Sequence, residues 1–357
     1  MSAPATSRRR PRRRRNRPDR LKERNVGNVG AVCIRIERDQ MTTLGAVVVL
    51  FHPTAEQIAR VVELRRRCDD LIVVDNTPQP DIRLAILFEE HDIVLINEGN
   101  KNGIAGAHNR GLTSQFDRGA DAVTLIDQDS VIPDNYFPVM REICTTLASQ
   151  PFMVGPRIFD EVVQEYLPVL ENNGIVVRRL DMHDDAGMQR CVFLISSGCV
   201  ISRAAFAKLG PFDEKLFIDH VDIEYCFRAR VHNIPLYATP ALTLSHRIGD
   251  LSRHKLGPFE MMTLNHPWYR RYYSARNAVQ LLLRYGRRYP IVFIANLLTL
   301  REIFYIALLE DAKLAKLTGI LLGIVDGLSG RLGPIEHARP RLVARFAHGA
   351  GRRGKRG

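Results

Sequence analysis

The chain has 357 residues, of which 45% are hydrophobic and 25% charged, which are ordinary values for a globular protein of one large or two small domains. The net charge of +12 is concentrated at the two ends, since residues 1–25 carry +9 and residues 338–357 carry +7, which leaves about −4 for residues 26–337. This distribution argues against a folded body with a basic surface for nucleic acid.

The two basic ends are expected to be disordered arms, because like charges repel and few apolar residues are present to bury. They could contact nucleic acid or anionic lipid. Neither arm interleaves aromatic residues with its arginines, so base stacking is not indicated. Met41 directly precedes the first strand-like run, so we interpret residues 1–40 as a mis-assigned start or a dispensable extension and residues 336–357 as a basic tail.

The cysteine pattern predicts a reducing location. None of the six cysteines forms a C-x-x-C motif and most stand in apolar surroundings, so buried free thiols are expected. The Arg-rich N-terminus has no apolar segment behind it, so no signal peptide is predicted. A cytoplasmic protein is expected. The cysteines are Cys33, Cys68, Cys144, Cys191, Cys199 and Cys226.

Apolar runs alternate with helix-like segments in the first third of the chain, which predicts a parallel sheet flanked by helices. The expected strands are 44–53, 70–76, 92–98 and 121–127, and the expected helices are 54–68, 83–91 and 103–116. In such sheets ligands bind beyond the carboxyl ends of the strands. Polar residues or prolines stand at those ends, namely Pro53, Asp75, Asn97, Glu98, Asp127 and Asp129.

Beyond residue 150 the pattern changes to shorter, mixed strands at 152–159, 173–180 and 191–203, then a helix at 222–233, a strand at 235–240 and a largely helical stretch at 269–325. The apolar segment 290–325 is interrupted by charges and lacks an uncharged run of about 18 residues, so a membrane-spanning helix is not favoured. An amphipathic helix or hairpin that packs on the core, a partner or a membrane surface is expected.

Two carboxylates one residue apart, Asp127 and Asp129 in "LIDQDS", end the fourth expected strand. They can serve as turn and cap residues, or their repulsion can be offset by a cation. A distant histidine after an apolar run, His246, completes a plausible ligand set for Mg²⁺ or Mn²⁺. No G-x-x-x-x-G-K-[ST] or G-x-G-x-x-G motif is present, so a P-loop protein and a Rossmann oxidoreductase are disfavoured.

A second group of acids, Asp219, Asp222 and Glu224, surrounds the expected start of the helix at 222–233. Acids at a helix N-terminus suit the helix dipole, Asp222 can act as an N-cap, and Glu224 can pair with Arg228 four residues on. These structural roles leave Asp219 and the neighbouring His220 unexplained.

The order of these motifs resembles that of the family 2 glycosyltransferases with a GT-A fold, and within them the bacterial rhamnosyltransferases. The resemblance covers roughly residues 44–285. It implies a GT-A catalytic domain at 41–265 with a mostly parallel central sheet, followed by a helical C-terminal region at 266–335. The matching segments are "VVVLFHP", "IVVDNT", "NEGNKNGIAGAHNRGL", "LIDQDS", "SSGCVISR", "FIDHVDIEYCFRAR", "LSHRIGD" and "YYSARNAVQLLLRY".

The resemblance also implies roles for individual residues. Asp127 and Asp129 match the motif that holds Mg²⁺ or Mn²⁺ on a nucleoside diphosphate, and His246 matches a histidine that completes the metal site. The donor pocket would be lined by Pro53, Asp75, Asn102, Asn109 and Asp127. Asp222 falls on the general base and Glu224 on a second acid. Val221 replaces the usual Glu, which together with Asp219 leaves the base open among Asp219, Asp222 and Glu224.

The resemblance implies an inverting glycosyltransferase that moves L-rhamnose from dTDP-L-rhamnose to a hydroxyl of a cell-surface glycan or a polyprenyl-linked saccharide. UDP-galactofuranose or a UDP-hexose is the alternative donor. A basic-armed nucleic-acid-binding protein and a nucleotidyltransferase are alternatives from other classes; the second lacks its usual Gly-rich loop, since "FHPTAEQ" follows the first strand. Peripheral contact with the inner face of the cell membrane and a homo-oligomer formed through the C-terminal helices are further expectations.

Overall fold

The structure is a computed structural model, and it describes residues 42–172, 177–183, 187–246, 251–256, 259–344 and 346. The described residues form one compact unit, which contains every helix and strand of the structure. The predicted N-terminal arm and most of the basic tail lie outside the described residues.

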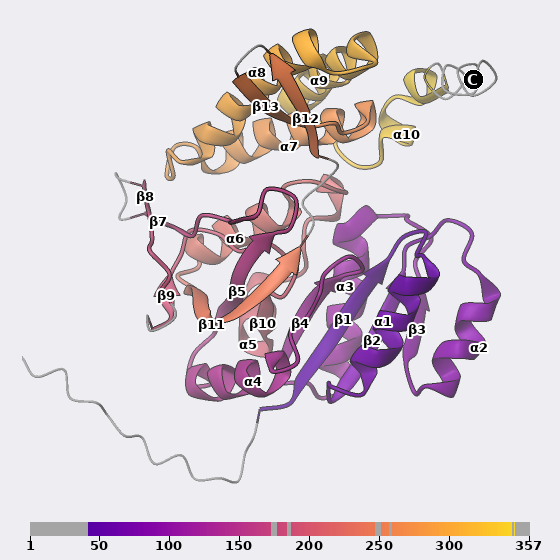
Figure 1. The fold of residues 1–357 in the computed structure, drawn as a ribbon, viewed down its shortest axis with the longest axis vertical. Helices are drawn as coiled ribbons and strands as arrows, with labels where there is room; N and C mark the ends of the chain where they lie inside the picture. The colour runs from indigo at the N-terminus through magenta and orange to yellow at the C-terminus, as the bar shows by residue number, and fades with distance from the viewer. Residues whose placement is uncertain are drawn as a thin grey trace, which may run out of the picture. The chain divides into compact units, whose positions relative to one another are not determined.

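The first third of the chain folds as the predicted β-α repeats, drawn in indigo to violet in Figure 1. Its strands pair in parallel in the order β3-β2-β1-β4. The elements are β1 (Leu44–Leu50), α1 (Ala55–Arg65), β2 (Asp70–Asp75), α2 (Ile82–Glu90), β3 (Val94–Asn97), α3 (Gly103–Asp117) and β4 (Ala122–Asp127).

The sheet continues beyond β4 with strands from the second half of the chain. The short β10 (Val200–Ser202) lies antiparallel between β4 and β5 (Met153–Asp160), and β5 pairs in parallel with β11 (Leu236–His246). Strands β4, β5 and β11 therefore run in the same direction and end at the same edge of the sheet. The mostly parallel sheet predicted from the sequence is confirmed. Short strands at its border are β6 (Glu165–Tyr166) and β9 (Gln189–Arg190).

Helices cover both faces of this sheet because its central strands alternate buried side chains between two apolar cores. Val47 and Val49 of β1 point into the core shared with α3, α5 (Arg203–Leu209) and α6 (Val221–Val231). Ala46 and Val48 point into the core shared with α1, α2 and α4 (Tyr136–Leu147). Five cysteines lie in these cores as free thiols, as predicted, while Cys33 lies outside the described residues: Cys68, Cys144, Cys191, Cys199 and Cys226.

Several elements differ from the sequence prediction. Helices α4 and α5, strand β7 (Leu170–Asn172) and the hairpin β12–β13 (Leu251–Leu256, Phe259–Leu264) were not predicted, while β8 (Val177–Arg179), which pairs with β7, lies in the run 173–180 that was expected to be a strand. The apolar run 191–203 was expected to be a strand, yet only Val200–Ser202 pairs in the sheet. Ser197 and Gly198 form the turn that a Ser-Gly pair favours, with Gly198 at φ +73°, and the strand begins only after it.

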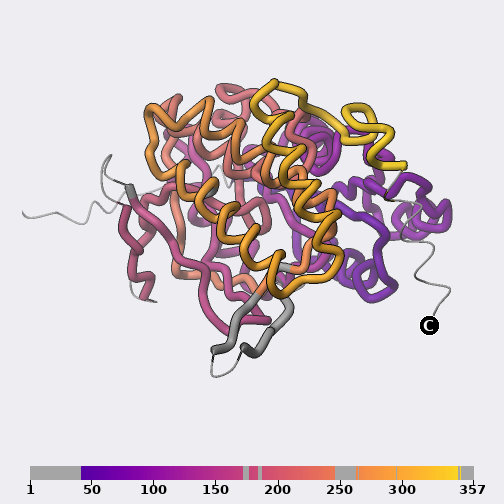
Figure 2. Tube along the Cα trace, turned by 90° about the horizontal axis from the view of Figure 1, so that it is seen from above, coloured from indigo at the N-terminus to yellow at the C-terminus, as the bar shows by residue number. Residues whose placement is uncertain are grey.

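The helical C-terminal region consists of α7 (Trp268–Tyr285), α8 (Val292–Leu309), α9 (Lys313–Ser329) and the short α10 (Ile335–Ala338). Figure 1 shows α7, α8 and α9 together in orange, and Figure 2 shows them from above. Helix α9 approaches α7 closely because Gly319, Gly323 and Gly327 face it. A Cβ at any of the three would lie only 2.3–2.8 Å from a backbone oxygen of α7.

Within the residues that the structure describes, α8 is the one helix long and apolar enough to cross a membrane, judged by length and composition alone. It nevertheless carries Arg301 and Glu302 near its middle. Glu302 forms an ion pair of 2.8 Å with the buried Arg271 of α7, which also pairs with Glu310 at 2.7 Å. These buried pairs attach α8 to the rest of the helical region.

Candidate active site

The Asp-Gln-Asp turn after β4 is tied to its neighbours through its central residue. The Gln128 side chain accepts a hydrogen bond from Phe51 N at 2.7 Å and donates one to Phe51 O at 3.1 Å. Farther along the turn, Val131 pairs with Ser245 next to the end of β11. The turn that carries Asp127 and Asp129 is thereby fixed between the carboxyl ends of β1 and β11.

The ends of β1, β2 and β3 form a second part of the site. Asp75 is 1% exposed, and one of its carboxylate oxygens accepts a hydrogen bond from Thr77 N at 2.9 Å. Its other oxygen, Oδ2, has no hydrogen-bond partner among the described residues. The side chains of Asn76 and Asn100 join the β2 and β3 ends. A buried, unpaired acceptor at this position suits a ligand donor such as a nucleobase N–H or a ribose hydroxyl.

Asp222 reaches the same site from α6, where it is the second helical residue. Its carboxylate accepts hydrogen bonds from Ile223 N at 2.8 Å and from the Ser196 N–H, and the adjacent Ser197 Oγ accepts one from Asp127 N at 3.4 Å, which links Asp222 to the end of β4. The N-cap of α6 is His220, not Asp222 as the sequence suggested. Asp219 forms an ion pair with Arg270 at 2.5 Å, so its charge is compensated by α7.

The turn before α6 is strained, since Phe217, Asp219 and His220 all have positive φ values between 59° and 68°. Asn277, a fully buried residue of α7, holds this turn. Its side-chain Nδ2 lies 3.0, 2.9 and 2.8 Å from the carbonyl oxygens of Leu216, Ile218 and Asp219. The helical region therefore positions the turn that leads into Asp222.

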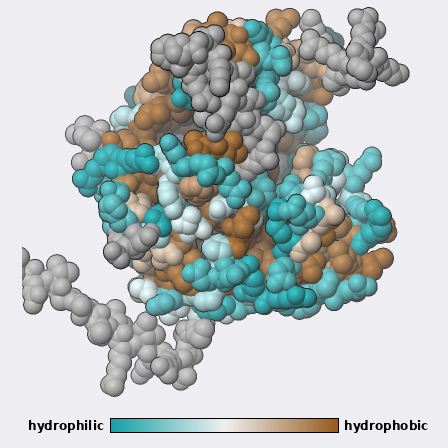
Figure 3. Space-filling model, viewed as in Figure 1, coloured by the Kyte–Doolittle hydropathy of each residue, from teal (hydrophilic) through white to brown (hydrophobic). Residues whose placement is uncertain are grey.

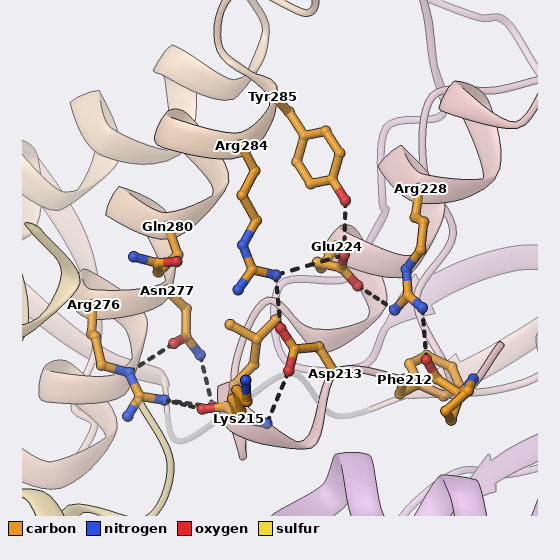
Figure 4. A network of polar contacts seen from close by, with 12 residues as sticks. Phe212, Asp213, Lys215, Glu224, Arg228, Arg276, Asn277, Gln280, Arg284 and Tyr285 are labelled. Atoms are coloured by element: carbon orange, nitrogen blue, oxygen red, sulfur yellow. Dashed lines mark hydrogen bonds and ion pairs between the residues drawn. The ribbon is translucent and has the colours of Figure 1, made fainter. Parts of the chain in front are cut away.

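Arg276 supports the same turn from the neighbouring position on α7, and Figure 4 shows it beside Asn277. It is fully buried and donates to the carbonyl oxygens of Lys215 at 3.1 Å and Leu216 at 2.8 Å. These contacts join residues about sixty positions apart in the chain, so the sequence offered no local signal for them. The "YYSARN" segment carries the resemblance, but no structural role was predicted for it.

The carboxylates that meet at the site repel one another. Burial, and then the charges of Asp129 and Asp222, raise the pKa of Asp127 to about 7. Burial also raises the pKa of Asp222, although backbone N–H groups of Ile223 and Ser196 oppose this effect. A cluster of this kind favours either a proton or a cation.

Glu224 lies away from this cluster, in the network that Figure 4 shows. It is 3% exposed and accepts hydrogen bonds from Tyr285 Oη at 2.8 Å and Arg228 Nη2 at 2.6 Å. Arg284 lies 3.8 Å from it and bonds Asp213 at 2.7 Å. The predicted pairing with Arg228 is present, and the network joins α6 to the end of α7.

Asn102 and Asn109 also lie outside the carboxylate cluster. Both line an open cavity of about 760 Å³ together with Glu224, Arg228 and residues 211–215. The Asn109 amide donates to Phe212 O at 3.0 Å and accepts from Phe212 N at 2.7 Å. This bonding joins α3 to the segment before α6, and a role for either residue in donor binding stays a prediction.

Two further residues with predicted roles, His246 and Pro53, lie at or just after strand ends. His246 ends β11 and is the neighbour of Ser245, which pairs with the Asp-Gln-Asp turn, but its side chain lies outside the described residues. Pro53 follows His52, which has φ +48° and whose N–H bonds Thr77 at 2.9 Å. Their places are consistent with the predicted roles, which stay predictions.

Comparison with known proteins decides the family. The chain is 30% identical over 305 residues to a protein described as dTDP-rhamnosyl transferase RfbF from Shigella flexneri, a match that covers 81% of this chain and 96% of that protein. The chain belongs to the rhamnosyltransferase-like glycosyltransferases of family 2. A more distant relative, 24% identical over 53% of this chain and 62% of its own length, is the low-salt glycan biosynthesis hexosyltransferase Agl10 of Haloferax volcanii. No family model matches the chain.

Solved glycosyltransferase structures confirm the GT-A fold. GalNAc-T7, crystallised with UDP, GalNAc and Mn²⁺, matches 69% of this chain with a TM-score of 0.50 and 12% identity. Staphylococcus aureus TarS matches 81% with a TM-score of 0.51 and 11% identity. The chain spans about half the length of each solved chain, 48% and 49% respectively. As a family 2 glycosyltransferase the protein is a transferase enzyme, which disfavours the nucleic-acid-binding alternative.

The side chains around Asp127 supply only part of the coordination shell that a hard divalent cation such as Mg²⁺ needs. Among the described residues, no group of three or more His, Cys, Asp or Glu side chains is arranged to hold a metal ion by itself. Mg²⁺ commonly takes one or two carboxylates and completes its shell with water and substrate phosphates. The two carboxylates of Asp127 and Asp129, with the raised pKa of Asp127, fit that mode.

Proposed function

We propose that this glycosyltransferase transfers L-rhamnose from dTDP-L-rhamnose to a hydroxyl of a saccharide acceptor, with inversion at the anomeric carbon. The observation that supports this most directly is the link between Asp222 and the Asp-Gln-Asp turn at the end of β4, which runs through Ser196, bonded to Asp222, and Ser197, bonded to Asp127. One site then offers two carboxylates for a metal-bound diphosphate and a third for the acceptor. The relative described as a dTDP-rhamnosyl transferase supports the choice of donor.

In the proposed reaction Asp222 accepts the proton of the acceptor hydroxyl as its oxygen attacks the anomeric carbon. The bond from that carbon to the diphosphate oxygen breaks, and the nucleoside diphosphate leaves with the electron pair. Mg²⁺ or Mn²⁺ held by Asp127 and Asp129, with His246 as a further predicted ligand, would neutralise the departing charge. Asp75 would accept a hydrogen bond from the nucleoside through its unpaired Oδ2.

The structure supports Asp222 over Asp219 as the base, since Arg270 neutralises Asp219. Both carboxylate oxygens of Asp219 accept hydrogen bonds from the Arg270 guanidinium, so this side chain is engaged by α7 and not directed at an acceptor. Burial instead raises the pKa of Asp222, which strengthens it as a base at neutral pH. No covalent nucleophile is required, and this is the basis for proposing inversion.

A UDP-hexose or UDP-galactofuranose is the second candidate donor, and the hexosyltransferase relative supports it. The acceptor proposed is a cell-surface glycan or polyprenyl-linked saccharide precursor. A cytoplasmic protein in peripheral contact with the inner face of the cell membrane stays part of the proposal, while the predicted homo-oligomer through the C-terminal helices stays an alternative use of the same helices. The domain limits at 41–265 and 266–335 likewise stay predictions.

A panel of sugar nucleotides tests the donor. Thermal stabilisation and slow hydrolysis should be measured for dTDP-L-rhamnose, dTDP-glucose, UDP-glucose and UDP-galactofuranose, each with Mg²⁺ or Mn²⁺ and with EDTA. Metal-dependent stabilisation and hydrolysis that are strongest with dTDP-L-rhamnose are expected. Binding limited to the UDP-sugars would contradict the rhamnosyl proposal, and equal binding with EDTA would contradict the metal.

A further inference from the structure

The helical C-terminal region exposes an unusual number of large apolar side chains. On α8 they form a stripe along one side, Phe293, Leu297, Leu300, Phe304 and Leu308, each between 50% and 65% exposed. On α9 they are Leu314, Leu321, Val325 and Leu328, between 45% and 77% exposed. We call these nine residues the apolar face. Figure 3 shows hydrophobic residues in brown in the upper part of the molecule, where Figure 1 places α8 and α9.

The inward sides of both helices are already occupied, so the apolar face is turned outward by packing. On α9 the Gly319, Gly323 and Gly327 side lies against α7. Leu321 and Val325 each follow one of these glycines by two positions, about 200° round the helix. On α8, Glu302 is attached to the buried Arg271 of α7. The apolar face is therefore not a core surface that a small rotation would bury.

The charges of the C-terminal region indicate what kind of surface the apolar face binds. From residue 284 to the C-terminus the sequence has fourteen Arg and Lys against five Asp and Glu, a net charge of +9. Residues 42–283 have 24 Arg and Lys against 30 Asp and Glu, a net charge of −6. Of the acids on and beside α8 and α9, Glu310 and Asp326 are buried in ion pairs. Among the exposed residues of this segment, Arg287, Arg288, Arg301 and Lys313 outnumber the acids Asp311 and Glu336, so its exposed charge is mainly positive.

We propose that the apolar face of α8 and α9 rests on the surface of an anionic lipid bilayer, with the helices lying in its interface. An apolar stripe bordered by Arg and Lys is the pattern of an interfacial helix. Each basic residue near an anionic surface adds attraction that falls with salt. A second copy of the chain is a poorer occupant, because symmetric pairing would bring two +9 regions together. A spanning α8 is disfavoured by Arg301 and Glu302 near its centre.

Vesicle flotation of the full chain tests this proposal without any donor or acceptor, so its failure leaves the proposed reaction untouched. The probes are vesicles of phosphatidylcholine alone and of phosphatidylcholine with phosphatidylglycerol, at low and high salt. We expect binding to the anionic vesicles that weakens with salt. Equal binding to both vesicle types, or binding to neither, would overturn the proposal.

The decisive variant carries Leu297→Glu and Phe304→Glu on α8, whose side chains are 65% and 58% exposed. Its partition onto anionic vesicles should fall by more than about tenfold, because burial of two large apolar side chains is lost. The matched control carries Ile82→Glu and Ile86→Glu on α2, which are 80% and 59% exposed, and should bind as the wild type does. Equal loss in both variants would show a general effect of added negative charge and overturn the assignment.

A second variant, on α9, tests the same proposal if the α8 variant does not fold. Leu321→Glu with Leu328→Glu changes α9 side chains that are 61% and 64% exposed, and should also lose vesicle binding while thermal unfolding stays near wild type. Light scattering on the eluting protein gives the oligomeric state without lipid. A monomer is expected. A dimer that the α8 or α9 variant dissociates, without vesicle binding, would assign the apolar face to a second copy instead.

Discussion

Asn277→Ala should lower turnover far more than donor binding, because Asn277 holds the strained turn that leads into Asp222. The substitution removes a side chain that is 0% exposed and whose Nδ2 lies 2.8–3.0 Å from three carbonyl oxygens of residues 216–219. Alanine offers no donor in its place, so the carbonyl oxygens of Ile218 and Asp219 lose theirs, whereas Leu216 O keeps its hydrogen bond from Arg276 Nη2 at 2.8 Å. The turn, which has three residues at positive φ, is then free to relax.

The expected losses of stability and of turnover have separate causes. Nδ2 carries two hydrogens, and two buried acceptors left without their donor cost about 1–3 kcal/mol each, so the free energy of unfolding should fall by roughly 2–6 kcal/mol. If the turn relaxes and moves Asp222 by about 1 Å, kcat should fall about 10²-fold. The donor KM should stay near wild type, because Asp75 and Asp127 stand on β2 and β4.

Gln280→Ala provides the matched control for a purely structural effect. Gln280 is also buried on α7, and its Nε2 donates to Gly327 O of α9 at 2.6 Å, away from the strained turn. Steady-state kinetics and urea unfolding should be measured for both variants. Both should be less stable, but only Asn277→Ala should lose kcat. The reasoning would be refuted by an Asn277→Ala enzyme with normal kcat, or by a Gln280→Ala enzyme with an equal loss.

Three further outcomes are expected. Asp129→Ala should keep its fold and lose metal-dependent turnover, and activity near wild type that still responds to metal would refute its role. Because the pKa of Asp127 is raised to about 7, the metal-free protein should lose stability as the pH rises toward 7. Mn²⁺ replaces the lost proton, so the increase in Tm on adding Mn²⁺ should grow from pH 5.5 to 7.5. An increase in Tm that does not depend on pH would contradict this. Glu224→Gln should lower stability by roughly 2–4 kcal/mol, since it leaves Arg228 unpaired, yet keep most of its turnover; inactivity at normal stability would instead make Glu224 the second acid.

The sheet could be predicted because β1, β2 and β4 are short, continuous apolar runs that end in polar residues. All residues of β1 are buried, which is the property that the sequence pattern reports. The Asp-Gln-Asp turn could be placed for the same reason, since it follows a strand end. Helix α4 was not predicted; its sequence, YFPVMREICTTL, has an early proline and no side-chain N-cap hydrogen bond to mark its start.

The supporting contacts of the site could not be predicted because their partners are remote in the chain. Glu224 could be paired with Arg228 by helical spacing, but Tyr285, 61 positions away, could not be found that way. The same holds for Asn277 and the turn at 216–219. The sequence left the base open among Asp219, Asp222 and Glu224, and the positions of Arg270 beside Asp219 and of Asp222 near Asp127 are what favour Asp222 over Asp219.

The most direct test of the proposed reaction is rhamnosyl transfer by the Asp222→Asn variant, measured with donor binding in the same preparation. With dTDP-L-rhamnose, Mg²⁺ or Mn²⁺ and a saccharide acceptor, turnover should fall about 10²- to 10⁴-fold, because the proton acceptor is lost. Metal-dependent stabilisation by dTDP-L-rhamnose should persist, since the donor ligands stand on β2 and β4. An Asp222→Asn enzyme that keeps most of its transferase activity, beside an inactive Asp219→Asn enzyme, would contradict the proposed mechanism and make Asp219 the base.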